Sequence, residues 1–227
     1  YDWSEFCIII FTEYAISTSA DDALSVHTAD VDGDGDMDIL SASYADDKIA
    51  WYENDGSESF TEHVISTSAD NAHSVHTEDV DGDGDMDVLS ASHADDKIAW
   101  YENDGSESFT EHVISTSADG ATFVHTADVD GDGDMDVLSA SFNDNKIAWY
   151  ENDGSESFTE HAISTSANGA RDVHAVDVDG DGDMDVLSAS RDDDKIAWYE
   201  NNGSETFTEH VISTSADGTT SVHAADV

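Results

Sequence analysis

A nine-residue acidic stretch that recurs at a fixed interval limits the possible folds of this chain more than any other feature. Its first copy, Asp30–Asp38, places five aspartates in nine residues and interleaves them with two glycines. Two carboxylates held ~5 Å apart repel by roughly 3 kcal/mol at an effective dielectric constant near 20, so an ordered, ionised loop needs a counter-charge. The stretch therefore predicts a cation site, with a solvated acidic turn as the plainer alternative.

Calcium is the cation that fits this stretch best. It accepts about six to eight oxygen ligands in a tolerant geometry, whereas magnesium prefers to keep its waters. Counted from Asp30, we expect side-chain ligands at positions 1, 3, 5 and 9, the main-chain carbonyl of Asp36 at position 7, and a sharp turn at Gly35. The candidate metal ligands of the four loops are Asp30, Asp32, Asp34, Asp36, Asp38, Asp79, Asp81, Asp83, Asp85, Asp87, Asp128, Asp130, Asp132, Asp134, Asp136, Asp177, Asp179, Asp181, Asp183 and Asp185.

The residues around the loop argue against an EF-hand, which opens in the same way. An EF-hand has a bidentate glutamate at position 12, where this chain has Ser41. The flanking segments 26–31 and 39–43 are short runs of β-branched and small residues, which indicate strands rather than helices. The loop therefore joins two strands.

The spacing of the loops predicts the architecture. Successive loops begin 49 residues apart, and Asp226-Val227 start another copy. A fixed period of this size indicates an array of one supersecondary unit. Short polar turns separate four predicted strands in each unit, which is typical of a β-propeller blade. In the first unit we expect these strands at Val26–Val31, Met37–Ser43, Lys48–Asn54 and Phe60–Ser66.

The motifs within a unit resemble a known family. A D-x-D-x-D-G-x-x-D loop between two strands, followed by Val-Leu-Ser-Ala-Ser and Lys-Ile-Ala-Trp-Tyr-Glu-Asn, is similar to the FG-GAP/VCBS repeats of calcium-binding β-propellers, which include integrin α-subunit heads. The resemblance extends from about Phe11 to the end of the chain. It implies an extracellular, non-enzymatic recognition or scaffolding module. Members of the family usually have six or seven blades with longer repeats. This chain differs from them in having fewer blades and shorter repeats.

We therefore expect one all-β domain over residues 1–227, a β-propeller of four-stranded antiparallel blades with four complete blades and an incomplete fifth. The fifth lacks its calcium loop, its second strand and the following turn, so residues 1–25 and 222–227 either form an incomplete blade or pair with a neighbouring molecule. A third interpretation is that the sequence is an excerpt of a longer array. The predicted units are 26–74, 75–123, 124–172 and 173–221.

Composition limits the partners and the compartment. The formal net charge of −48, with only six Lys and Arg residues, argues against nucleic acid and anionic membranes as partners. The single Cys7 cannot form an intrachain disulfide, and the longest apolar run, Phe6–Phe11, is too short to span a membrane. Because the chain starts at Tyr1, we interpret it as a processed product or a segment of a longer protein. Turn carboxylates suit extracellular calcium levels.

Differences between the units gather at two connections. They occur in the turn after the second strand and in the link from the fourth strand to the next unit, which lie at the same end of an up-and-down blade. We hypothesise that this end makes the specific contacts, with drift in unconstrained loops as the alternative. The proposed anchors are Tyr44, Phe123, Phe142, Arg171 and Arg191.

Other periodic residues have structural interpretations. One tryptophan per unit, as at Trp51, is expected to pack between blades, with sugar stacking as the alternative. Histidines recur in the first strand, as at His27, and in the fourth, as at His63; we expect repeated hydrogen bonds, since a transition-metal site requires two or more to converge. Asn202 begins the only N-glycosylation sequon, Asn-Gly-Ser.

No set of residues in the sequence indicates catalysis, because each acidic cluster is a repeated loop and no nucleophile–base pair stands out. We expect a non-enzymatic, calcium-binding extracellular structural or adhesive repeat protein, a building block of a surface filament or matrix. Its partners would be copies of itself, another extracellular protein or a glycan, without membrane insertion. The alternative is a lectin-like propeller with one sugar site per blade.

Overall fold

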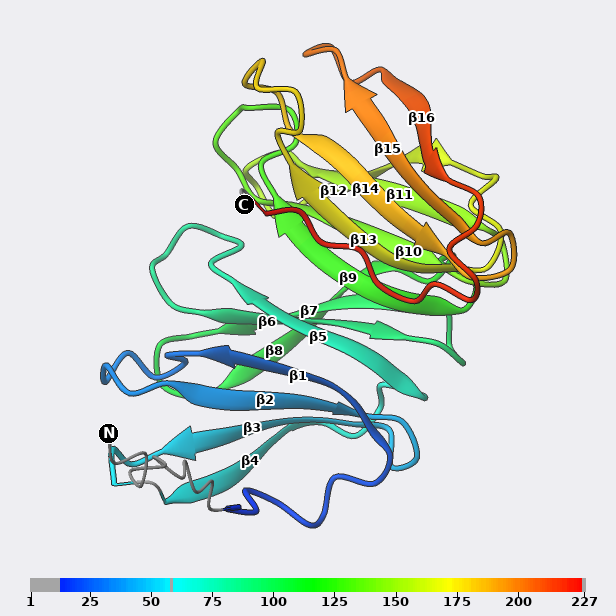
Figure 1. Cartoon of the computed structure of the whole chain (residues 1–227). Coiled ribbons are helices and arrows are strands. Elements are labelled where there is room, and N and C mark those ends of the chain that lie inside the picture. The colour runs from blue at the N-terminus through cyan, green and yellow to red at the C-terminus, as the bar shows by residue number, and fades with distance from the viewer. Residues whose placement is uncertain (1–12, 58, 226–227) are drawn as a thin grey trace, which may run out of the picture.

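The chain is an array of β-sheets. This computed structural model describes residues 13–57 and 59–225, which contain sixteen strands and no helix. The strands form four antiparallel sheets of four, and within each sheet the strands are ordered as in the chain. In Figure 1 the sheets follow one another from the blue N-terminal part to the orange C-terminal part.

The strand bounds repeat from sheet to sheet. The first sheet contains β1 (Ala23–Ala29), β2 (Asp38–Ser43), β3 (Lys48–Asn54) and β4 (Phe60–Ser66). The second contains β5 (Ala72–Glu78), β6 (Asp87–Ser92), β7 (Lys97–Asn103) and β8 (Phe109–Ser115). The third contains β9 (Ala121–Ala127), β10 (Asp136–Ser141), β11 (Lys146–Asn152) and β12 (Phe158–Ser164). The fourth contains β13 (Ala170–Val176), β14 (Asp185–Ser190), β15 (Lys195–Asn201) and β16 (Phe207–Ser213).

The third and fourth strands of the first unit have the predicted bounds, but the first strand is shifted. It starts at Ala23, directly after Asp22, whose φ of 53° marks a turn, and its pairing with β2 is irregular between Ala23 and Ser25. It ends at Ala29 instead of Val31, because the Val31 N–H donates to the Asp38 carboxylate at 3.0 Å. Residues 30 and 31 thus belong to the acidic loop.

Apolar side chains hold consecutive sheets together. Between the first and second sheets, Leu40 and Trp51 pack with Val75 and Tyr101 in one buried cluster. Equivalent clusters lie between the second and third sheets and between the third and fourth. The tryptophans of the first three sheets are fully buried, which confirms the packing interpretation and removes them as sugar-stacking surfaces: Trp51, Trp100 and Trp149.

Polar side chains also link each sheet to the one before it. The Asn103 amide, in the second sheet, donates to the Val31 carbonyl in the first at 3.1 Å, and this bond recurs at the next two junctions. Lys97 donates to the Ser68 carbonyl and forms ion pairs with Asp95 and Glu111. All four lysines make the same set of contacts, so their role is structural.

Four histidines of the first strands, together with His223 of the C-terminal segment, form a row across the sheets. Ring centroids of consecutive members are 4.7–5.1 Å apart, and burial lowers the pKa of His76 to about 3 and that of His125 to about 4. No three of these imidazoles form a metal-ligand cluster within the described ranges. The histidines of the fourth strands make the expected repeated hydrogen bonds, as between His63 and Glu53 at 2.8 Å. The members of the row are His27, His76, His125, His174 and His223.

The predicted fifth blade is not formed in the described part of the chain. Residues 13–22 and 214–225 contain no strand, and residues 1–12 and 226–227 lie outside the described ranges. The C-terminal segment nevertheless follows β13, since the Val222 N–H donates to Asp172 at 2.8 Å and His223 lies beside His174 (Figure 1). It therefore lies where the first strand of another unit would lie.

Packing between sheets predicts unequal effects for two equivalent valines. Val124 is 0% exposed between sheets, whereas Val26 at the same position of the first sheet is 71% exposed. We expect Val124→Ala to lower the free energy of unfolding by about 1–3 kcal/mol and Val26→Ala by less than about 0.5 kcal/mol. Urea denaturation in calcium measures both. Equal losses would mean that the stacked faces do not supply the stability.

Candidate metal centres

The last aspartate of each acidic loop is anchored by the backbone. Asp38 opens β2 and is fully buried, with its Oδ2 accepting from the Val31 N–H at 3.0 Å and its Oδ1 from the Asn54 N–H at 2.8 Å. Because two backbone donors satisfy this buried carboxylate, it holds the loop against the end of β3. Asp87, Asp136 and Asp185 make the same pairs of bonds.

Hydrogen bonds within the loop shape the turn. The Gly35 N–H donates to Asp30, and the Asp34 N–H donates to Asp32, at 3.1 and 3.0 Å. Gly33 and Gly35 have φ values of 74° and 96°, and a side chain at either position would meet open space. Glycine is therefore favoured at these two positions by the positive φ of the backbone and not by a lack of space for a side chain.

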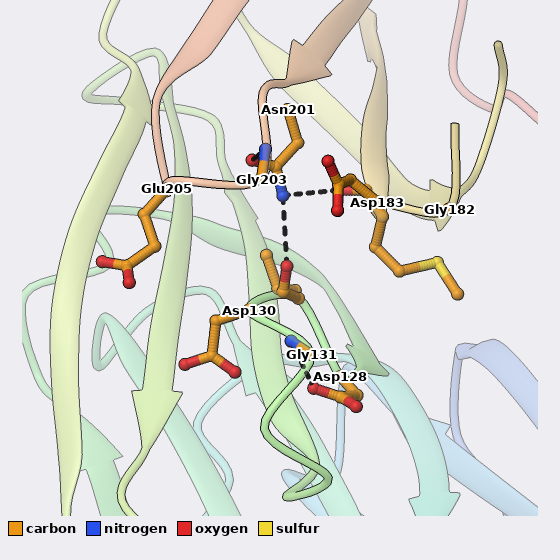
Figure 2. A pocket seen from close by; sticks show the side chains of 10 residues that line it. Asp128, Asp130, Gly131, Gly182, Asp183, Asn201, Gly203 and Glu205 are labelled. Carbon is orange, nitrogen blue, oxygen red and sulfur yellow. Dashed lines mark hydrogen bonds between the residues drawn. The ribbon is translucent and has the colours of Figure 1, made fainter. Parts of the chain in front are cut away.

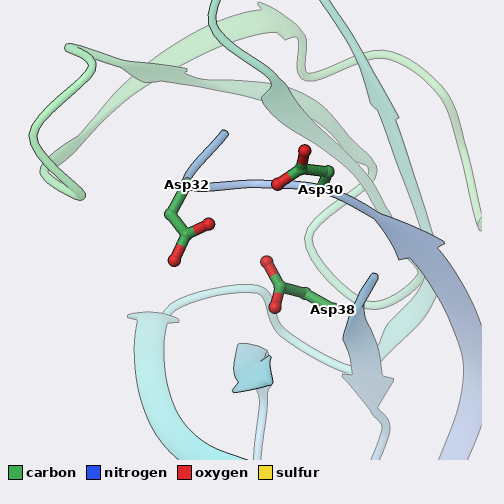
Figure 3. A group of neighbouring side chains, drawn as sticks. All are labelled: Asp30, Asp32 and Asp38. Carbon is green, nitrogen blue, oxygen red and sulfur yellow. The ribbon is translucent and has the colours of Figure 1, made fainter. Parts of the chain in front are cut away.

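Three carboxylates converge in every loop. Oxygens of Asp30, Asp32 and Asp38 lie within 4.8 Å of one another, and Figure 3 shows the three side chains directed toward a common point. The same positions converge in the other loops. The remaining clusters are Asp79, Asp81 and Asp87; Asp128, Asp130 and Asp136; and Asp177, Asp179 and Asp185.

The structure leaves the other two aspartates of each loop outside these clusters. Asp34 accepts from the Asp36 N–H at 2.8 Å. Asp36 lies against Gly56 of the turn after β3, where a Cβ would collide with its carboxylate. These aspartates support the loop and its contact with the neighbouring turn. The residues outside the clusters are Asp34, Asp36, Asp83, Asp85, Asp132, Asp134, Asp181 and Asp183.

The clusters fit a divalent cation with oxygen ligands. One carboxylate oxygen of Asp30, and the equivalent oxygen of Asp79, is buried without a hydrogen-bond partner among the described residues. Burial, and then the charges of neighbouring aspartates, raise the pKa of Asp32. An unpartnered oxygen amid like charges is a site that a cation stabilises, and an all-oxygen ligand set favours a hard ion such as calcium. Each repeat therefore contains an aspartate cluster that could hold a metal ion.

The acidic loops lie where one sheet meets the next. A cavity of about 180 Å³ separates the third loop from the fourth sheet, lined by Asp128 and Asp130 on one side and by Asp183, Asn201 and Glu205 on the other (Figure 2). The Asn201 amide bridges it by donating to the carbonyls of Val129 and Met184, both at 3.1 Å. Asp128 and Asp130 of the third cluster therefore lie beside the asparagine bridge that joins the third and fourth sheets.

The predicted contact residues gather at the opposite end of the sheets from the metal loops. The turn after β2 bonds to the segment before β1 through the Tyr44 N–H and the Asp22 carbonyl, at 3.0 Å. Phe142 and Arg191 occupy the same place in their sheets, and Arg171 is the second residue of β13. Arg171 and Arg191 both lie over the Phe142 ring, at 4.5 and 4.6 Å. Phe123 lies in β9.

The asparagine of the glycosylation sequon, Asn202, is exposed in the turn after β15.

The bridging asparagines are functional residues that the sequence analysis missed. Asn54, Asn103, Asn152 and Asn201 each end the third strand of a sheet, and the last three reach back to the preceding loop. Their invariance at one position of every unit was the available signal. The convergence of the first-strand histidines was also not predicted, because spacing along the chain does not show which strands become neighbours.

These features define a repeat protein built from four-stranded sheets, each with one potential cation site. The chain belongs to the FG-GAP-like repeat family, whose sequence model matches residues 30–90, 79–139, 128–188 and 177–227. The resemblance inferred from the motifs is thereby confirmed. A comparison with curated proteins gives no significant match.

Solved structures share the fold at low sequence identity. An Agrocybe aegerita lectin that recognises non-reducing terminal N-acetylglucosamine is 19% identical (TM-score 0.56), with 82% of this chain and 51% of the lectin covered. The V. cholerae biofilm matrix protein Bap1 is 20% identical (TM-score 0.53), with 81% and 27% covered. A putative 6-phosphogluconolactonase from Bacteroides uniformis is 15% identical (TM-score 0.58), with 86% and 56% covered. The chain spans about half the length of the lectin and of the putative lactonase.

The clusters predict a countable change in metal binding. We expect the wild-type chain to bind four calcium ions, and Asp130→Asn to weaken one site at least about tenfold, because it removes one of three converging charges. Asp70→Asn makes the same charge change at an exposed position outside the loops and should leave four sites intact. Calorimetric titration measures the stoichiometry. An unchanged profile for Asp130→Asn would contradict the assignment.

The buried anchors predict proton release on metal binding. Burial raises the pKa of Asp87 and Asp136 to about 6, above the unfolded value of 3.8, so the metal-free fold is favoured by their protonation and loses that stability as pH rises through about 6. A bound cation favours the ionised form. Calcium titrations at pH 6 in buffers of different ionisation enthalpy should show proton release that disappears by about pH 8. Identical heats in both buffers would contradict this prediction.

Proposed function

We propose that the protein is a calcium-binding extracellular structural or adhesive repeat protein in which bound ions hold successive sheets together. The observation that carries this proposal is the position of the first three acidic clusters beside the next sheet, as where Asn201 reaches the carbonyl of Val129. The converging aspartates would hold the ion. Its positive charge would offset their repulsion and stiffen the junction.

We further propose that the four sheets are blades of a β-propeller that another copy of the chain extends, as in a filament or matrix. The exposure of two valines supports this extension of the array. Valines that are buried between sheets inside the array have counterparts at its two ends that are exposed. Val178 in the fourth loop is 43% exposed, whereas Val31, Val80 and Val129 are 2–4% exposed. Val26 in the first sheet is also exposed. A sheet of a second copy, or an incomplete fifth blade, would cover these faces by the contacts already used between sheets.

An extracellular, non-catalytic role fits the chemistry of the molecule. Sites built from turn carboxylates suit calcium at extracellular levels. The fold likeness to a biofilm matrix protein supports the same setting. Residues 13–57 and 59–225 form no helix, and therefore no membrane-spanning one. The described groups of metal-ligating residues are all repeated loops, which supports metal binding rather than catalysis as their role.

A lectin is the second candidate, favoured by the polar cavity of Figure 2 and by the fold likeness to the Agrocybe aegerita lectin. A sugar at each junction would be held by carboxylates and amides, because the junction tryptophans are buried. A glycan array separates the two candidates. Binding at several equivalent sites per chain favours the lectin.

Electron microscopy and light scattering of the purified chain test the structural role. In millimolar calcium we expect ordered oligomers that dissociate when EGTA is added and re-form when calcium is restored. Asp130→Asn should weaken assembly, whereas Asp70→Asn, with the same charge change, should not. Monomers in calcium, or oligomers that resist EGTA, would contradict the proposal.

A further inference from the structure

At one end of the described sheets, the side chains differ from unit to unit. The second residue of each first strand differs between sheets, as does the residue after each second strand. The first group comprises Leu24, His73, Thr122 and Arg171, and the second comprises Tyr44, His93, Phe142 and Arg191. The sheet contacts bring residues of both groups together, so that near-identical units build one asymmetric surface.

Arg171 is the unpaired cation of this surface. Each of the four lysines is paired with two carboxylates, and Arg191 donates to Asp192 at 2.8 Å. Arg171 lies over the Phe142 ring, makes no ion pair with a carboxylate among the described residues, and its Nε is buried without a hydrogen-bond partner. A guanidinium offers planar donors that match a carboxylate, and Arg171 has no carboxylate partner among the described residues.

A cavity of about 440 Å³ opens beside Arg171. Asp22, Leu24 and Tyr44 of the first sheet line it together with His73 and His93 of the second and with Arg171 itself. The ring centroids of Tyr44 and His73 are 6.2 Å apart, and those of His73 and His93 are 5.7 Å apart, which makes one wall aromatic. The volume lies within the range of small-molecule sites, about 300–1,000 Å³.

The polar groups of the cavity suit a hydroxylated ligand. Burial, and then the charges of Arg171 and His93, lower the pKa of His73 to about 4, so its imidazole is neutral at pH 7 and offers one donor and one acceptor. The Asp22 carboxylate can accept hydroxyl protons. Aromatic rings provide a flat apolar surface of the kind that packs against the C–H face of a sugar ring. Among the described residues that line the cavity, Arg171 is the one with a permanent positive charge.

We propose that this cavity binds a small carbohydrate that carries a single carboxylate, with Arg171 pairing to the carboxylate and Tyr44 packing against the sugar ring. A ligand with one anionic group fits better than a polyanion, because the chain's net charge of −48 repels extended negative partners. The site would be present once per chain, unlike the four metal loops. It does not depend on calcium-driven assembly.

Titration calorimetry in calcium tests the proposal with sodium D-glucuronate as the probe and D-glucose as its neutral counterpart. We expect one glucuronate per chain and much weaker binding of glucose. Arg171→Gln should weaken glucuronate binding by about tenfold or more. Arg191→Gln removes the same charge from the same Phe142 ring but from a residue that does not line the cavity, so it should change affinity by less than about threefold.

Tyr44→Ala, at another residue that lines the cavity, provides a second test if Arg171→Gln does not fold. Far-UV circular dichroism checks the fold of each variant. We expect Tyr44→Ala to weaken glucuronate binding while leaving calcium stoichiometry unchanged. Equal binding of glucose, equal binding of acetate or inorganic phosphate, equal losses in the two arginine variants, or no binding of millimolar glucuronate would each overturn the proposal. So would four glucuronates per chain, which would place binding at the repeated junctions.

Discussion

The buried carboxylate at the end of each acidic loop is the interaction on which the rest of the structure depends. Asp38 and its three counterparts receive two backbone N–H bonds each, one from the loop and one from the end of the third strand. These bonds fix the loop where its other aspartates converge. Burial nevertheless raises the pKa of Asp87 and Asp136, so two neutral donors do not fully replace water around the charge. The same carboxylate is therefore both a structural anchor and a potential ligand, which a bound cation would keep ionised.

Charge distribution follows from the repeated junctions. All four lysines are held inside the fold, each between carboxylates of its own sheet and a main-chain carbonyl of the segment before that sheet. Few positive charges therefore remain to offset the acidic side chains on the surface. Bridging asparagines bring the next sheet against each of the first three acidic loops. Because the junction contacts lie beside the candidate metal cluster, a bound cation would link metal binding to sheet stacking. The array therefore has its potential metal sites at the places where neighbouring sheets could separate.

Local features of a unit were predictable from the sequence, and contacts between units were not. The bounds of the third and fourth strands and the loop aspartates at positions 1, 3 and 9 depend on alternation and turn chemistry within a few residues. The start of β1 was missed because Asp22 adopts a left-handed turn that composition does not reveal. The side chain of Asp34 and the main-chain carbonyl of Asp36 were also predicted as ligands, and these two assignments stay predictions, because both side chains lie outside the three-carboxylate cluster. The histidine row and the stacking of two arginines on Phe142 depend on how sheets are oriented to one another, which the period of the repeat does not encode.

The near-identity of the junctions has a consequence for how such a chain evolves. Insertion or deletion of a whole 49-residue unit by unequal recombination would recreate the same asparagine bridge and the same apolar cluster at each new boundary, so copy number is free to drift. The cavity beside Arg171 is different, because it combines side chains of the first, second and fourth sheets. A unit added or lost between the first and fourth sheets would move these residues apart. A lineage that retains this cavity would therefore keep a fixed number of repeats between them, although nothing in the repeated packing itself imposes one.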